Sequence, residues 1–140
     1  MEKIIKKRAV EQNGLKIVHR SYDVFEKFKS QENQIAVIGL GYVGLPLAMR
    51  LNKYFGVIGY DLSKTKVKSI QNHVDPNGEL STEEMSRSVL KVSDNETVLK
   101  NAQFYIATVP TPVDSNKEID LSMIQGACEL IGRYLKKGDV

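Results

Sequence analysis

Three glycines directly behind an apolar run constrain the fold of this 140-residue chain more than any other feature. The run IAVIG at 35–39 is continuous and rich in β-branched residues, which predicts a strand covered on both faces, as in a parallel sheet. Apolar residues in 43–54 then follow helical spacing, so Gly39, Gly41 and Gly44 lie at a strand-to-helix turn. In such a GxGxxG turn, the first glycine permits the tight bend and the second lets a diphosphate approach the backbone. The third lets the helix pack close to the sheet.

A lone acid ends the second apolar run. The sequence VIGY at 57–60 predicts a second strand, and Asp61 follows it about twenty residues after Gly39. A carboxylate at this point of a dinucleotide-binding unit accepts hydrogen bonds from the adenosine ribose hydroxyls. The structural alternative is that the glycines only make a turn and that Asp61 caps the next helix. That alternative leaves the shared context of strand, turn, helix and acid unexplained.

The rest of the chain alternates between helical and extended patterns. Ser63 is a candidate cap for a helix at 64–71, and STEE at 81–84 resembles a capping box. The further expected elements are a strand at 89–93, a helical turn at 95–99, a strand at 104–109 and a helix at 121–135. This order predicts an α/β fold, a truncated Rossmann-type doubly wound parallel sheet at 34–140.

The chain offers few candidates for catalysis or metal binding. Its single cysteine, Cys128, excludes an internal disulfide and lies on the helical stripe 121, 124, 128, 131, 135, which predicts a buried apolar residue. His19 and His73 have no partner at ligand spacing and are expected at the surface or in turns. Asp120 is expected to cap a helix, and a metal pair of Asp114 with Asp120 is the alternative. We therefore assign no catalytic residue and no metal site.

Charge and hydropathy limit the partners. The formal net charge is +3, and its excess lies in an N-terminal extension, residues 1–33, where Tyr22, Phe25 and Phe28 suggest a short amphipathic helix. The body at 34–140 is neutral, which argues against nucleic acid as a partner. The sequence has no long apolar segment and no secretory signal, so we expect a cytoplasmic protein without membrane partners.

Four motifs carry a family resemblance. GLGYVGLPLA at 39–48, GYD at 59–61, VPTPVD at 109–114 and the helix beginning DLS at 120 resemble the N-terminal NAD-binding domain of nucleotide-sugar 6-dehydrogenases, the UDP-glucose/GDP-mannose dehydrogenase superfamily. The VPTP form most resembles the branch that acts on UDP-N-acetylhexosamines. The resemblance implies an oxidoreductase that uses NAD to oxidise a sugar C6 alcohol to a carboxylate, through a thioester on a cysteine, for surface polysaccharides such as capsule.

The resemblance also implies roles for individual residues. Tyr42 and Val43 would meet the diphosphate through backbone N–H groups, Asp61 the ribose, and Lys66 the adenosine side. Thr111 would lie in the loop beside the nicotinamide half. The full set of expected cofactor-binding residues is Gly39, Gly41, Tyr42, Val43, Gly44, Asp61, Lys66 and Thr111.

Family members are much longer than this chain, which implies a fragment of a longer enzyme. Their catalytic cysteine lies in a further domain, so the resemblance implies that the chain is inactive alone and that the full-length enzyme is a homodimer or higher oligomer. Two other functions stay open: a free-standing NAD(H)-binding sensor, and a Rossmann-like interaction module without a ligand. The PTP loop favours the dehydrogenase, because a sensor does not need that loop beside the nicotinamide.

Overall fold

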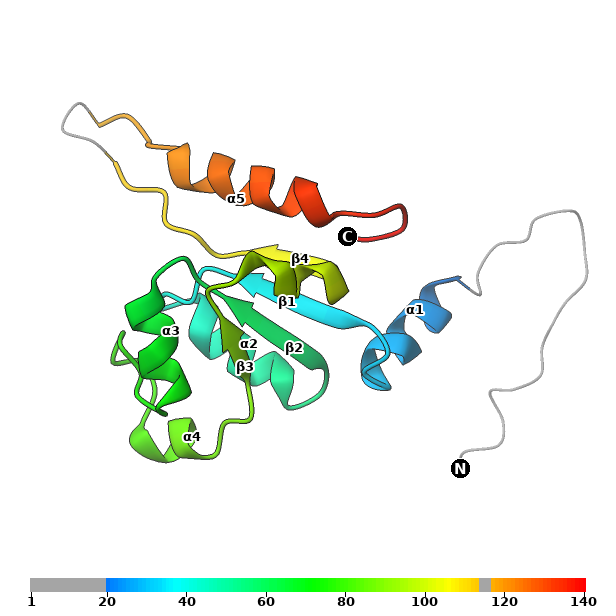
Figure 1. Ribbon diagram of the computed structural model, residues 1–140, viewed down its shortest axis with the longest axis horizontal. Coiled ribbons are helices and arrows are strands. Elements are labelled where there is room, and N and C mark those ends of the chain that lie inside the picture. Colours follow the sequence, from blue (N-terminus) through cyan, green and yellow to red (C-terminus); the bar gives the residue numbers. More distant parts are fainter. Residues whose placement is uncertain (1–19, 114–116) are drawn as a thin grey trace, which may run out of the picture.

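A four-stranded parallel sheet forms the centre of the molecule (Figure 1). The computed structural model describes residues 20–113 and 117–140. The strands lie in the order β3-β2-β1-β4, which matches the first four strands of a Rossmann sheet. Their bounds are β1 (Gln34–Ile38), β2 (Gly56–Tyr60), β3 (Lys91–Ser93) and β4 (Ala102–Ala107). The predicted fold class is confirmed, although β3 is shorter than the run expected at 89–93.

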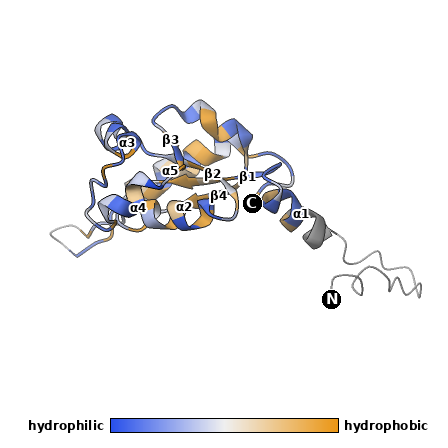
Figure 2. Ribbon diagram, turned by 90° about the horizontal axis from the view of Figure 1, so that it is seen from below, coloured by the Kyte–Doolittle hydropathy of each residue, from blue (hydrophilic) through white to orange (hydrophobic). Residues whose placement is uncertain are grey.

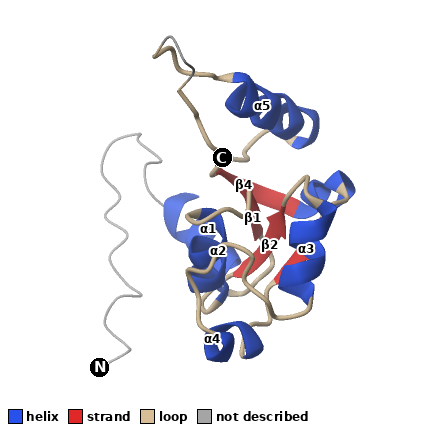
Figure 3. Ribbon diagram, turned by 90° about the vertical axis from the view of Figure 1, so that its left-hand side faces the viewer, coloured by secondary structure: helices blue, strands red, loops and turns tan. Residues whose placement is uncertain are grey.

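Helices cover both faces of this sheet (Figures 1 and 3). One face carries α1 to α4, and the other carries α5 together with the 3₁₀ helix η1. Their bounds are α1 (Arg20–Lys29), α2 (Gly44–Asn52), α3 (Lys64–Gln71), α4 (Thr82–Ser86), η1 (Glu96–Asn101) and α5 (Ser122–Tyr134). The sheet is therefore doubly wound, as the alternation of strands and helices predicts.

The central strand β1 is apolar along its whole length because it has a core on each side. Ile35 and Val37 pack among the side chains of α1 to α4, whereas Ala36 and Ile38 pack toward η1 and α5. Hydrophobic residues gather on the strands and on the helix faces that meet them (Figure 2). A strand buried on both faces cannot alternate polar and apolar residues, which explains the continuous run in the sequence.

Local capping signals fix the short helices. The hydroxyl oxygen of Ser63 accepts the Lys66 N–H at 3.2 Å, and Ser81 forms the expected capping box with Glu84 at the start of α4. Before α5, Asp120 accepts the Ser122 N–H at 2.8 Å. These bonds satisfy amide groups that a helix start leaves without intrahelical partners.

The prediction that Cys128 is buried is wrong. Cys128 is exposed, and so are Leu121, Ile124 and Leu135 on the predicted stripe. The face of α5 that packs on β4 and η1 is the neighbouring one, which carries the buried residues Ala127 and Leu130 and the partly buried Tyr134. Ile131 of the predicted stripe lies at the border of this face and is partly buried against the same core. Both stripes have helical spacing, so the sequence pattern alone does not distinguish them. Because α5 covers β4, the edge strand of the described sheet, only one face of the helix meets a core.

Several remaining expectations concern surface groups. His73 lies exposed in the turn after α3, with its Nδ1 2.8 Å from the Met85 carbonyl oxygen. His19, Asp114 and the side chain of Tyr22 lie outside what the structure describes.

Within residues 20–113 and 117–140, no helix is long and apolar enough to cross a membrane. The same part of the chain has no group of three His, Cys, Asp or Glu that could hold a metal ion.

The helix α1 packs on the body of the domain. Phe28 is 8% exposed, and its ring meets Phe104 of β4 edge-on, with centroids 6.2 Å apart. Phe25 is half exposed and meets Phe55 in a similar way, at 6.1 Å. The predicted amphipathic helix is thus present, and it anchors the segment before β1 through one buried ring.

Truncating the two phenylalanines of α1 should have unequal effects. Phe28→Ala should lower the free energy of unfolding by about 3 kcal/mol, because it opens a cavity in a packed core. Phe25→Ala is the matched control and should cost less than about 1 kcal/mol, because half of its ring already faces solvent. Urea unfolding of both variants measures the difference. Equal losses would contradict the anchoring role of Phe28.

Candidate functional site

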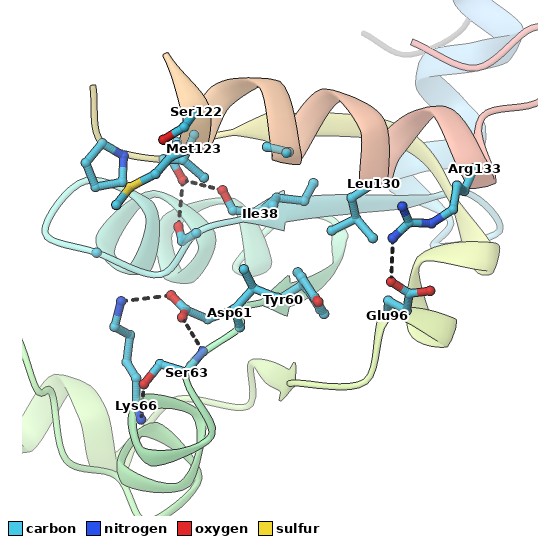
Figure 4. Close-up of a pocket in the computed structure, with 18 residues that line it drawn as sticks. Ile38, Tyr60, Asp61, Ser63, Lys66, Glu96, Ser122, Met123, Leu130 and Arg133 are labelled. Carbon is cyan, nitrogen blue, oxygen red and sulfur yellow. Dashed lines mark hydrogen bonds and ion pairs between the residues drawn. The ribbon is translucent and has the colours of Figure 1, made fainter. Parts of the chain in front are cut away.

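A cavity of about 520 Å³ lies at the carboxyl ends of β1 and β2, below α5 (Figure 4). In doubly wound sheets, ligands bind outside the carboxyl ends of the strands, where helices leave for opposite faces. The polar lining comes from the glycine turn, the end of β2 and the start of α3, and also from Glu96, Thr108, Ser122 and Arg133. The apolar lining consists of Ile38, Leu62, Val109, Pro110, Met123, Ala127 and Leu130.

The glycine turn has the backbone geometry that its sequence predicts. Gly39 has a φ of +91°, which favours glycine, and its N–H donates to the Tyr60 carbonyl at 2.8 Å. A Cβ at Gly44 would overlap the Gly39 carbonyl oxygen, so the third glycine allows the first turn of α2 to lie against the strand end. A Cβ at Gly41 would meet nothing within 4 Å. The second glycine therefore faces open space.

This open space lies at the start of α2, where a helix presents amide groups. The first N–H groups of a helix have no intrahelical acceptor, and the helix dipole adds partial positive charge there. Together these features favour the binding of a phosphate group at the turn.

Asp61 joins the turn to the start of α3. It is 7% exposed, and its Oδ2 accepts the Leu40 N–H at 2.7 Å and the Lys66 ammonium at 2.9 Å. Its Oδ1 accepts the Ser63 N–H at 2.9 Å. The structure thus brings together the predicted ribose acid and the predicted adenosine-side lysine (Figure 4).

The same contacts determine the charge state of Asp61. Burial raises the pKa of this carboxyl, but the hydrogen bonds from Lys66, Ser63 and Leu40 outweigh burial and hold the pKa below its ordinary value. Asp61 is therefore ionised at neutral pH. A carboxylate accepts about four hydrogen bonds, and Asp61 accepts three, so one acceptor position is left for a ligand donor. A second ligand donor would have to take the position that Lys66 occupies.

A second ion pair marks the opposite end of the cavity (Figure 4). Arg133 of α5 donates to Glu96 at 2.7 Å, and the Tyr134 hydroxyl donates to the same carboxylate at 3.0 Å. These bonds lower the pKa of Glu96. The pair connects α5 to η1 at the end of the cavity away from the glycine turn.

The predicted site residues divide into two groups. Gly39, Gly41, Asp61 and Lys66 line the cavity, whereas Thr111 is exposed and outside its lining. Tyr42 and Val43 lie at the exposed tip of the glycine turn, with 70% and 50% of their surface accessible, and Gly44 opens α2.

Sequence reasoning missed the wall of the cavity. Thr108, Val109 and Pro110 after β4 line it, and so do Met123 and other residues of α5. The VPTP motif did indicate that this loop was near the cofactor, but it suggested Thr111. Apart from Ser122, which belongs to the DLS motif, the α5 residues of the wall were not indicated by any motif, because their place depends on how the helix crosses the sheet.

The parallel sheet, the glycine turn with its open space and the buried acid after β2 define a dinucleotide-binding Rossmann domain. Comparison with known proteins makes this more specific: residues 33–140 match the UDP-glucose/GDP-mannose dehydrogenase family, NAD binding domain. The chain belongs to this family and is an NAD-binding domain of it.

Individual relatives agree with the family match. A UDP-N-acetyl-D-glucosamine 6-dehydrogenase of Salmonella typhi is 41% identical over 114 residues, covering 81% of this chain and 27% of the relative. Protein CapL of Staphylococcus aureus is 36% identical over 101 residues, covering 72% of this chain and 24% of the relative. The solved UDP-D-ManNAc dehydrogenase of Pyrococcus horikoshii has a TM-score of 0.64 at 32% identity, covering 76% of this chain and 27% of the solved chain. The chain thus spans about a quarter of the length of these relatives.

The lowered pKa of Asp61 predicts an acid-sensitive contribution to stability. Because the pKa is lower in the folded state, this contribution is present above the ordinary value of 3.8 and is lost as pH falls through the folded pKa. Asp61→Asn should therefore lower the free energy of unfolding by roughly 2 kcal/mol at neutral pH and by much less at the acid end. Urea unfolding of both proteins at several pH values tests this. A difference that stays constant with pH would contradict it.

Proposed function

We propose that this chain binds NAD across the cavity as part of an enzyme that oxidises the C6 alcohol of a UDP-N-acetylhexosamine to a carboxylate. The names of the relatives support this substrate class, since they include UDP-N-acetyl-D-glucosamine and UDP-N-acetyl-D-mannosamine dehydrogenases. The product would serve surface polysaccharide synthesis, as the sequence resemblance implies. Cytoplasmic location and assembly of the whole enzyme as a homo-oligomer are parts of the same proposal.

The open space over Gly41, beside a buried carboxylate, carries this proposal. The diphosphate would lie over Gly41 and accept hydrogen bonds from the backbone N–H groups of Tyr42 and Val43. The adenosine ribose would donate to Asp61. A dinucleotide presents both of these groups, a diphosphate and a sugar that bears hydroxyls.

The remaining parts of the cavity suit the rest of the cofactor. The apolar wall formed by Leu62, Val109 and Leu130 would hold the adenine ring, and Lys66 lies on that adenosine side. We place the nicotinamide half toward the loop that carries Thr111. NAD supplies the hydride acceptor when bound, and this chain binds and orients it. We assign no catalytic residue here, and we expect no dehydrogenase activity from these residues alone.

Gly41→Val should abolish dinucleotide binding and leave the fold intact. The valine side chain would occupy the space of the diphosphate, and a Cβ at this position meets no protein atom within 4 Å, so we expect the fold to persist. NADH fluorescence titration measures binding, and circular dichroism checks the fold. The matched control is Gly132→Val, an exposed position of α5 where a Cβ also meets nothing within 4 Å. Undiminished NADH affinity in folded Gly41→Val would refute the phosphate site.

NAD should bind about ten- to a hundredfold more tightly than NADP, because a 2′-phosphate removes a donor to Asp61 and adds repulsion. Lys66 limits this preference, since its ammonium lies 2.9 Å from Asp61 Oδ2 and could pair with the phosphate. Asp61→Ser should lower the affinity for NAD and raise the affinity for NADP, so the preference for NAD should become smaller. Calorimetric titration of both cofactors on both proteins is the measurement. Equal affinities in the unmodified chain would remove Asp61 from the ribose site.

A further inference from the structure

One peptide of the glycine turn is held from both sides. The carbonyl of Gly39 accepts a hydrogen bond from the Thr108 hydroxyl at 2.7 Å, and the following N–H, of Leu40, donates to Asp61 at 2.7 Å. Thr108 follows β4 and Asp61 follows β2, the two neighbours of β1 in the sheet (Figure 1). The Gly39–Leu40 peptide is thus fixed by the ends of both flanking strands.

The Thr108 hydroxyl has one proton, and its geometry indicates where this proton goes. The hydroxyl oxygen lies 3.1 Å from the Ile38 carbonyl oxygen but 2.7 Å from that of Gly39. The Ile38 carbonyl already accepts the Thr108 N–H at 2.8 Å. The shorter contact is to the Gly39 oxygen, which accepts no other hydrogen bond from the residues that the structure describes. We therefore assign the hydroxyl proton to this contact.

A glycine turn needs such a fixed peptide. Gly39 has access to many backbone conformations, so its φ of +91° does not by itself determine the direction of the next peptide. A rotation of the Gly39–Leu40 peptide would turn the Leu40 N–H away from Asp61 and reorient Gly41. The direction of the amide groups beyond Gly41 depends on the same peptide.

Close packing on the same carbonyl strengthens this coupling. A Cβ at Gly44 would overlap the Gly39 carbonyl oxygen and crowd the Thr108 hydroxyl oxygen. The first turn of α2, the Gly39 carbonyl and the Thr108 side chain therefore meet at one point. A shift of Thr108 would therefore displace the first turn of α2, which faces the open space.

We propose that Thr108 is a positioning residue for the diphosphate-binding turn: its hydroxyl fixes the Gly39–Leu40 peptide, and thereby the amide groups that would bind the diphosphate. The proposal rests on the proposed function for its binding readout. No family motif quoted above includes Thr108, which precedes VPTP. Its role comes from the pairing of β1 with β4, which places it beside Gly39.

Three variants test this role. Thr108→Val keeps the shape but loses the donor, Thr108→Ser keeps the donor, and Thr82→Val makes the same change at an exposed site on α4. Thr108→Val should weaken NADH and ADP-ribose binding roughly three- to tenfold, as expected for one lost hydrogen bond. Thr108→Ser should restore most of the affinity, and Thr82→Val should leave it unchanged. Thr108→Ala, which adds no bulk beside Gly44, replaces the valine variant if the latter does not fold.

A second readout needs no ligand. In the ligand-free protein, amide hydrogen exchange at Leu40 should become at least about threefold faster in Thr108→Val and return toward the unmodified rate in Thr108→Ser. Unchanged exchange with weakened NADH binding would mean that Thr108 touches the cofactor directly, which overturns a positioning role. Unchanged binding in Thr108→Val would overturn it as well. If the unmodified chain binds no NADH, the proposed function fails, and the Leu40 exchange rate still decides whether Thr108 fixes the peptide.

Discussion

The arrangement of the site depends on the hydrogen bonds that the Asp61 carboxylate accepts. This carboxylate is buried, and it remains ionised because it accepts hydrogen bonds from Leu40, Ser63 and Lys66. Each of these donors belongs to a different feature: the glycine turn, the loop after β2 and the helix α3. A buried charge without such donors would be costly, so folding of the three features and ionisation of Asp61 are coupled. The site is preformed for the same reason.

The sheet topology explains why these groups meet. Parallel strands carry their carboxyl ends to one edge, and β1 lies between β2 and β4. Asp61 after β2 and Thr108 after β4 therefore reach the same peptide after β1, although they are far apart in the sequence. Helix α2 leaves this edge for one face and α5 covers the other, which leaves the cavity between them.

Sequence patterns predicted those parts of the fold that depend on local chemistry. The apolar run of β1, the turn at Gly39, the cap at Ser63 and the capping box at Ser81 all depend on residues close together in the chain, and the structure contains each of them. The buried face of α5 was predicted wrongly, because two adjacent stripes share helical spacing. The polar site was predicted through Asp61, but Thr108 and the apolar wall were not. Their positions depend on strand register and on helix crossing, which no local pattern encodes.

The contact between Lys66 and Asp61 bears on how the site would recognise its cofactor. The Lys66 ammonium occupies one acceptor position of the Asp61 carboxylate. A ribose hydroxyl that replaced it would exchange a charged donor for a neutral one, so the net gain from the ribose would be small. The diphosphate has no such competitor, because the space over Gly41 is open and the helix start offers amide groups in a fixed direction. We therefore expect the glycine turn to supply most of the affinity, whereas Asp61 and Lys66 together determine which ribose is accepted.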